Sequence, residues 1–88
     1  MGKPTIVALA SGKKAYIWTN NEKPSINHWY MTRREIDYWK IQKDFHCQEN
    51  NVTYYKIVEY YNGDCLFTGK TLAQIREIMR DNTYRMVI

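Results

Sequence analysis

Apolar residues recur along this chain with two different spacings, and each spacing occurs twice. Apolar runs at 5–10 and 15–19 flank a turn at Gly12, and a longer β-forming segment at 52–68 is centred on Asn62-Gly63. Gly-centred turns between such runs are typical of β-hairpins. A stripe of apolar residues at helical spacing follows each segment. The pattern therefore predicts two hairpin-then-helix units.

Both predicted helices carry the same start signal. Thr32 and Thr71 each stand three residues before Glu or Gln, with isoleucine next, which is a capping box that opens an apolar stripe. The second helix is predicted from Thr71 to about Asp81, and residues 84–88 are predicted as a last strand. We therefore expect an α+β fold in the order β-β-α-β-β-α-β, with an antiparallel sheet packed by both helices on one face.

The first hairpin is expected to be apolar on both faces. A two-residue turn at Gly12-Lys13 places Val7 and Leu9 with Tyr16 and Trp18 on one face, and Ile6, Ala8 and Ala10 with Ala15 and Ile17 on the other. A hairpin of this kind is predicted to lie in the centre of a sheet or to be covered on both sides.

The second hairpin is expected to have one core face and one aromatic face. A type I′ turn at Asn62-Gly63 pairs Tyr60 with Cys65 and Val58 with Phe67, and this face is predicted to be core. On the opposite face, Ile57, Tyr61 and Leu66 alternate with Glu59 and Asp64. That face is predicted to be an aromatic, partly charged surface.

The first predicted helix has two apolar sides instead of one. At helical spacing, Tyr38, Ile41 and Phe45 cluster on one side, while Ile36 and Trp39 lie roughly opposite, close to Lys40 and Lys43. Two interpretations stay open. The second side packs on the other helix or under the preceding loop, or it is a partner or self-association surface led by Trp39.

A long connection precedes this helix and ends in two aromatic residues. Asn20 to Ser25 is polar and contains Pro24, and the segment continues through Trp29 and Tyr30. Connections of this length without regular structure are uncommon and are often functional. The alternative is that Trp29 and Tyr30 only anchor the loop to the core.

Size and composition predict one small, folded, soluble domain covering residues 1–88. Hydrophobic residues make up 44% and aromatic residues 15% of the 88 residues, which excludes disorder caused by low hydrophobicity. No apolar stretch has the length of a bilayer span or a signal-peptide core, so we expect a cytoplasmic protein with reduced cysteines and no membrane association. The net charge of +4 favours an acidic protein surface or nucleic acid as partner.

The sequence offers little for catalysis or cofactor binding. His28, His46, Cys47 and Cys65 have no spacing typical of a metal site, and adjacent His46 and Cys47 diverge on a helix. Gly69-Lys70-Thr71 resembles the end of a phosphate-binding loop but lacks its first glycine, because Asp64 stands there. We therefore expect no enzymatic activity, no metal and no cofactor.

The expected function is a small protein-protein interaction module, in the setting of a phage or mobile-element accessory protein that binds and modulates a host protein. The expected partner-binding residues are Trp39, Ile36, Lys40, Lys43, Trp29, Tyr30, Tyr61, Arg33 and Arg34. The same surface could instead bind a second copy of the chain and form a homodimer. The alternative function is nucleic-acid binding, with dispersed lysines and arginines on phosphates and tyrosines stacked on bases.

Overall fold

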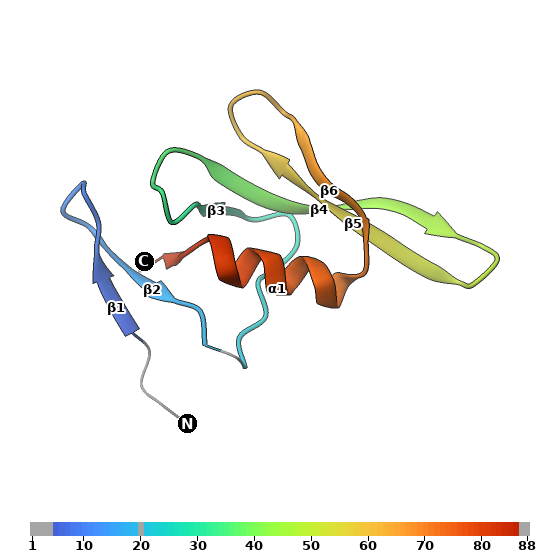
Figure 1. Ribbon diagram of the computed structural model, residues 1–88, viewed down its shortest axis with the longest axis horizontal. Helices are drawn as coiled ribbons and strands as arrows, with labels where there is room; N and C mark the ends of the chain where they lie inside the picture. Colours follow the sequence, from blue (N-terminus) through green and yellow to red (C-terminus); the bar gives the residue numbers. More distant parts are fainter. Residues whose placement is uncertain (1–4, 20, 87–88) are drawn as a thin grey trace.

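Seven strands and one helix make up the part of the chain that the computed structural model describes, residues 5–19 and 21–86 (Figure 1). The elements are β1 (Thr5–Ala8), β2 (Lys14–Ile17), β3 (Trp29–Met31), β4 (Tyr38–Cys47), β5 (Val52–Glu59), β6 (Cys65–Lys70), α1 (Leu72–Asn82) and β7 (Arg85–Met86). They form two antiparallel sheets, in the orders β1-β2-β7 and β3-β4-β5-β6. The sheets are joined where the Tyr84 N–H donates to the Met31 carbonyl at 2.9 Å.

The prediction of two helices packed on one sheet is wrong, because the first predicted helix is a strand. Residues 38–47 form β4, which pairs with β3 on one side and β5 on the other. Its sequence is rich in Tyr, Trp, Ile and Phe, which fit a pleated surface better than a helix. A β-bulge between Lys43 and Phe45 inserts an extra residue, so the side chains before and after it do not follow one regular alternation. The apolar residues of this irregular strand therefore have a spacing that resembles that of a helix.

The capping box predicted at Thr32 does not form either. Glu35 has a backbone φ of 59°, in the left-handed region that a helix cannot use, and its carboxylate accepts the Ala10 N–H at 2.8 Å. The Thr32 hydroxyl donates to the Asp37 carbonyl at 3.3 Å. These bonds close the turn between β3 and β4 and tie it to the first hairpin.

The second predicted helix is confirmed. Thr71 caps α1, its hydroxyl accepts the Gln74 N–H at 3.2 Å, and the Gln74 side chain accepts the Thr71 N–H at 3.0 Å. Ile75 and Met79 of the predicted stripe are fully buried against Ile41 of β4 and Ile57 of β5. The core thus lies between α1 and one face of the four-stranded sheet, which we call the inner face.

The first hairpin forms, but with another register than predicted. Val7 pairs with Ala15 and Ile6 with Tyr16, because the connection spans residues 9–13 instead of two residues. Ala15 is fully buried beside Leu9, whereas Ile6 is 54% exposed. The hairpin is therefore covered on one face only, and β1 lies at a sheet edge.

The second hairpin also has a longer turn than predicted, and its faces are exchanged. Val58 pairs with Cys65 and Ile57 with Leu66, so the turn includes Tyr60. Ile57 is fully buried and Leu66 packs on the core, so the face predicted to be surface is the inner face. The last predicted strand is confirmed at 85–86, and residues 87–88 lie outside the described residues.

A buried hydroxyl links the end of α1 to the first sheet. Thr83 is fully buried, accepts the Trp18 indole N–H at 3.1 Å and donates to the Met79 carbonyl at 2.6 Å. Thr83→Val keeps the shape but leaves the indole N–H without its acceptor, so we expect the free energy of unfolding to fall by roughly 1–3 kcal/mol in chemical denaturation. Thr83→Ser keeps the hydroxyl and should lose about 1 kcal/mol or less; equal losses in both variants would contradict this role.

Candidate functional site

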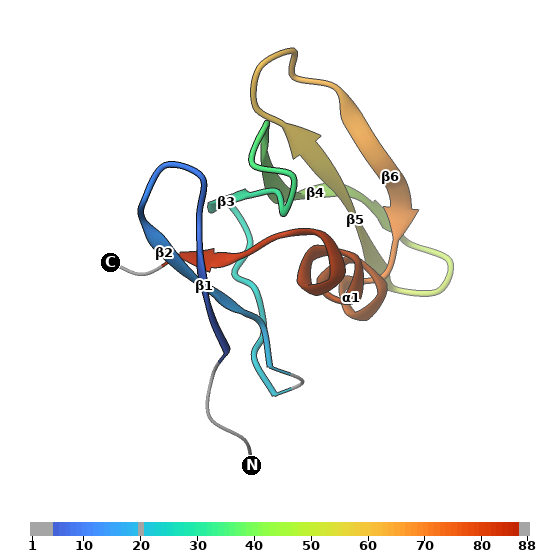
Figure 2. The same ribbon diagram turned by 60° about the vertical axis from the view of Figure 1, so that its left-hand side comes forward.

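Exposed aromatic side chains gather on the face of the four-stranded sheet that α1 does not cover. Figure 2 shows α1 nearly end-on, on one side of β4 and β5. Because side chains alternate along a strand, Lys40 points away from the helix when Trp39 and Ile41 point toward it. We call the exposed group the outer patch, and its residues are Trp29, Tyr38, Lys40, Tyr60 and Tyr61.

The outer patch is exposed to a degree that is unusual for large aromatic residues. The exposed fractions are 38% for Trp29, 37% for Tyr38, 54% for Tyr60 and 65% for Tyr61. Single apolar residues on a surface need no explanation, but a contiguous cluster marks an interaction site.

The aromatic rings of the outer patch hold one another edge to face. The ring centroids of Trp29 and Tyr60 are 5.0 Å apart with an interplanar angle of 83°, and Tyr60 and Tyr61 are 5.2 Å apart at 88°. Tyr38 lies 5.8 Å from Tyr60 at 68°. The Lys40 ammonium lies 4.5 Å from the centroid of the Trp29 ring, a cation-π contact. The patch is therefore a packed cluster instead of a set of free rings.

Glu59 positions the turn that carries two of these rings. Its side chain is buried, and its carboxylate accepts the backbone N–H groups of Tyr61 and Asn62. The Tyr60 N–H donates to the Tyr38 carbonyl at 3.0 Å, which continues the pairing of β4 and β5 by one residue. A single carboxylate thus fixes the backbone that presents Tyr60 and Tyr61.

Two neighbouring carboxyl groups lie under this turn, and their pKa values move in opposite directions. Burial and the adjacent Glu59 raise the pKa of Asp37 above its usual value. Burial also acts to raise the pKa of Glu59, but the backbone N–H donors of Asn62 and Tyr61 and a hydrogen bond with Asp37 outweigh it and lower that pKa. On acidification, Asp37 therefore takes up a proton before Glu59 does.

The Asp37→Asn variant should show that Asp37 and Glu59 make opposite contributions to the pH dependence of stability. The raised pKa of Asp37 costs the folded state stability as pH rises through its titration, whereas the lowered pKa of Glu59 costs stability as pH falls through its own. Without Asp37, we expect a slightly higher unfolding midpoint at neutral pH and a steeper loss of stability on acidification. Thermal unfolding at a series of acidic pH values and at neutral pH measures both effects. If the loss of stability on acidification is the same as in the wild type, Asp37 and Glu59 are not coupled.

Lysine side chains share the face of the outer patch, and carboxylates lie at its turns. On β3, β4 and β5 the side chains that share its face include Lys40, Gln42, Lys56 and Val58, and no carboxylate occupies a register position of that face within these strands. Asp37 and Glu59 accept backbone N–H groups of the turns, and Asp44 accepts the Gly69 N–H at 2.9 Å. Asp64 is exposed in the turn that carries Tyr60 and Tyr61. An approaching surface therefore meets aromatic rings and ammonium groups.

The structure divides the partner-binding residues predicted from the sequence into two groups. Trp29, Lys40 and Tyr61 meet in the outer patch, whereas Trp39 and Tyr30 pack against the core on the inner face. Lys43 is exposed on β4 opposite Tyr55, next to the bulge. The expectation that Ile36, Trp39, Lys40 and Lys43 share one side of a helix is wrong, because residues 38–47 form a strand.

Arg33 is engaged in hydrogen bonds that stabilise the fold. Its guanidinium donates to the carbonyl of Arg80 at 2.6 Å and to that of Thr83 at 3.3 Å, which caps the end of α1. Arg34 and the 65% exposed Ile36 line a cavity of about 380 Å³ together with Trp39 and Leu66. That cavity lies between the β3–β4 turn and the end of α1.

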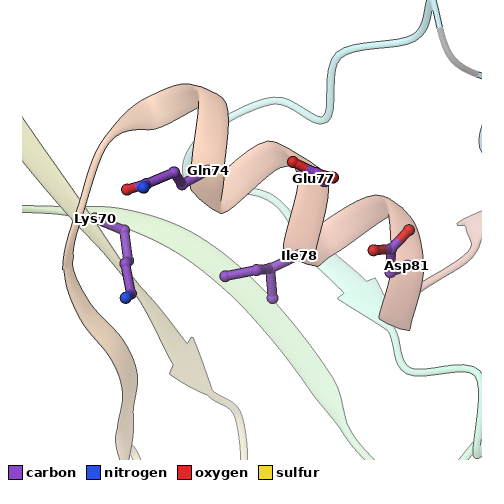
Figure 3. Close-up of a pocket in the computed structure, with 5 residues that line it drawn as sticks. All are labelled: Lys70, Gln74, Glu77, Ile78 and Asp81. Carbon is purple, nitrogen blue, oxygen red and sulfur yellow. The ribbon is translucent and has the colours of Figure 1, made fainter.

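Ionisable side chains outside the outer patch lie along α1 and across the β4–β5 pair. The pocket of about 350 Å³ in Figure 3 lies along α1, which supplies Gln74, Glu77, Ile78 and Asp81, and Lys70 lines it from the end of β6. The His46 ring hydrogen-bonds Thr53 at 2.9 Å across the β4–β5 pair. No group of three or more His, Cys, Asp or Glu side chains within the described ranges is placed to hold a metal ion.

Sequence reasoning missed Tyr38 and Tyr60 as surface residues. Tyr60 was assigned to the core because a two-residue turn pairs it with Cys65. The signal that was available is the alternation of Tyr38, Lys40 and Gln42 with Trp39 and Ile41, which a strand separates onto two faces.

Comparison of the chain with protein-family models, with curated proteins and with solved structures gives no match. Within residues 5–19 and 21–86, no helix is long and apolar enough to cross a membrane.

Proposed function

We propose that this chain is a non-enzymatic interaction module that binds a partner protein through the outer patch. The observation that supports the proposal is the cluster of Trp29, Tyr38, Tyr60 and Tyr61, with the Lys40 ammonium over the Trp29 ring, on the helix-free face of a sheet. Trp and Tyr are enriched among the residues that dominate binding energy at protein interfaces. Packed edge-to-face rings lose little conformational freedom on binding, because they are already ordered.

The arrangement of the rings favours a protein over nucleic acid. Single-stranded nucleic acid binds by stacking bases flat on exposed rings. In the outer patch, neighbouring rings stand at 68° to 88° to each other, and Lys40 covers Trp29. Such a surface complements irregular side chains better than a row of bases.

Most arginines are also engaged inside the protein and contribute little to a phosphate-binding surface. The guanidinium groups of Arg33, Arg76 and Arg80 donate to backbone carbonyls, and Arg85 pairs with Glu22. The positive charge left near the aromatic rings comes from lysines. The partner surface that fits is apolar at its centre and acidic at its edge.

Affinity capture from a lysate of the source cells tests this function. The bait is the wild-type chain, with Tyr60→Ser as the test variant and Phe45→Ser as the matched control, since Phe45 is 48% exposed and Tyr60 is 54% exposed. We expect one protein to be retained by wild type and Phe45→Ser, lost with Tyr60→Ser, and unaffected by nuclease.

Two results would overturn the proposal. Release of the captured protein by nuclease, or capture of nucleic acid that Tyr60→Ser abolishes, would assign the outer patch to nucleic acid. Equal capture by Tyr60→Ser and wild type would remove the outer patch from the binding surface. A second copy of the chain as the captured protein would identify a homodimer, which the mass in solution reports independently.

A further inference from the structure

A groove of about 590 Å³ lies beside β3 and shares Trp29 with the outer patch. Trp18, Trp29 and Tyr30 supply its aromatic walls, and Glu22, Lys23 and Arg85 supply its charged groups. Trp18 and Tyr30 meet edge to face with ring centroids 5.1 Å apart. Trp29 is therefore common to the groove and the outer patch.

The loop that forms one side of the groove is held in place from several directions. Arg76 and Arg80 of α1 donate to the carbonyls of Pro24 and Glu22, both at 3.2 Å. The Ser25 N–H donates to the Tyr30 hydroxyl at 3.0 Å, and Pro24 is fully buried. The long connection noted in the sequence is therefore a fixed wall instead of a free loop, and a fixed wall loses little entropy on binding.

Two cationic side chains and one carboxylate line the groove. The Glu22 carboxylate is paired with Arg85, whose guanidinium also lies 4.2 Å from the centroid of the Tyr16 ring. Lys23 is exposed and pairs with no carboxylate in the described part of the chain. Lys23 in the groove and Lys40 on the outer patch are thus cations with no carboxylate in an ion pair with them among residues 5–19 and 21–86, and Trp29 is common to both surfaces.

We propose that the partner binds with an acidic segment containing aromatic residues, which crosses Trp29 and places carboxylates at Lys40 and at Lys23. This inference rests on the proposed function and specifies the chemistry of its partner. Aromatic residues of the segment pack against Trp29, Tyr60 and the walls of the groove, where edge-to-face contacts are available. Carboxylates meet ammonium groups that water now solvates, which favours fast, salt-dependent association.

Defined polymers test this chemistry without knowledge of the partner. Fluorescence polarisation measures binding of labelled glutamate-tyrosine copolymer, polyglutamate, lysine-tyrosine copolymer and oligothymidylate to the full chain. We expect the glutamate-tyrosine copolymer to bind most tightly. Lys23→Glu and Lys40→Glu should each weaken its binding by about tenfold or more, equivalent to about 1.4 kcal/mol. Lys13→Glu, at the tip of the first hairpin, is the charge-matched control and should change it by less than about twofold.

Each other outcome overturns a defined part of the account. If Lys23→Glu behaves as Lys13→Glu does while Lys40→Glu and Trp29→Ala weaken binding, the segment does not enter the groove and the outer patch stands alone. Equal binding of polyglutamate and the copolymer overturns the aromatic requirement. Tightest binding of oligothymidylate overturns both this inference and the proposed function. If no polymer shows binding that depends on Trp29, the partner segment is not acidic and aromatic. The proposed function is then tested by the capture experiment alone.

Discussion

Trp39→Ala is expected to lower the free energy of unfolding by about 3 kcal/mol, the size typical of removing a large core aromatic side chain. Trp39 packs against the cluster of Ile41, Ile57, Ile75 and Met79, and its ring centroid lies 6.0 Å from that of Phe67. Its partial exposure places the effect at the lower end of the range for tryptophan. The sequence left Trp39 open as either a core or a partner residue, and its place on the inner face favours the core.

Thermal and urea denaturation measure this effect. In a domain of this size, a loss of about 3 kcal/mol lowers the unfolding midpoint by roughly 10–20 °C. Trp39→Phe keeps most of the apolar volume and should cost clearly less. A cooperative melt of Trp39→Ala at the wild-type temperature would show that Trp39 is not a core residue and would return it to the binding surface.

In contrast to Trp39→Ala, the Trp29→Ala variant is expected to have a large effect on partner binding and a small effect on the free energy of unfolding. Trp29 lies at the boundary of the outer patch and the groove, so its removal takes away the aromatic surface common to both. Truncation of an interface tryptophan commonly costs about 2 kcal/mol or more, which is at least about thirtyfold in affinity. Trp29 is 38% exposed, and its contacts with Lys40 and Tyr60 are at the surface, so the fold should lose little.

The measurement is a titration of the captured protein with Trp29→Ala and with Trp39→Phe as the control. The two variants remove aromatic surface from opposite faces of the same strand pair, since Trp29 pairs with Lys40 and Trp39 with Tyr30. We expect only Trp29→Ala to weaken binding. If both variants bind as wild type does, or if Trp39→Phe is the weaker binder, the outer patch is not the docking surface.

Local signals in the sequence predicted α1 correctly and failed at Thr32. At Thr71 the capping box and the apolar stripe agree, and Ile75 and Met79 are buried as predicted. At Thr32 the same letters are present, but Glu35 bonds Ala10, which is 25 positions away in the chain. A bond between distant segments is not visible in local spacing, and it decided the backbone conformation there.

The registers of both hairpins show a second limit of sequence reasoning. Gly12 and Asn62-Gly63 marked the correct turns, but each connection contains more residues than a two-residue turn. In the second turn, the buried Glu59 carboxylate holds extra backbone N–H groups and so stabilises the longer loop. A change in register moves side chains to the other face, which is why Tyr60 was predicted as core and lies on the surface.

The candidate site was predictable in composition but not in geometry. The sequence indicated an aromatic and basic surface and named Trp29, Lys40 and Tyr61, which the structure brings together. It placed Lys40 beside Trp39 on one side of a helix, because a helical period was assigned to residues that form β4. Only the strand alternation separates Lys40 from Trp39, and the bulge at Lys43 disguised that alternation.

The most direct test of the central claim is a hydroxyl-radical footprint of the protein alone and in complex with its captured partner. The account predicts that oxidation of Trp29, Tyr60 and Tyr61 falls strongly on binding, while Phe45, which is 48% exposed on the far part of β4, stays as reactive as before. Unchanged oxidation of Trp29 and Tyr60 in a saturated complex would contradict the claim that the outer patch binds the partner.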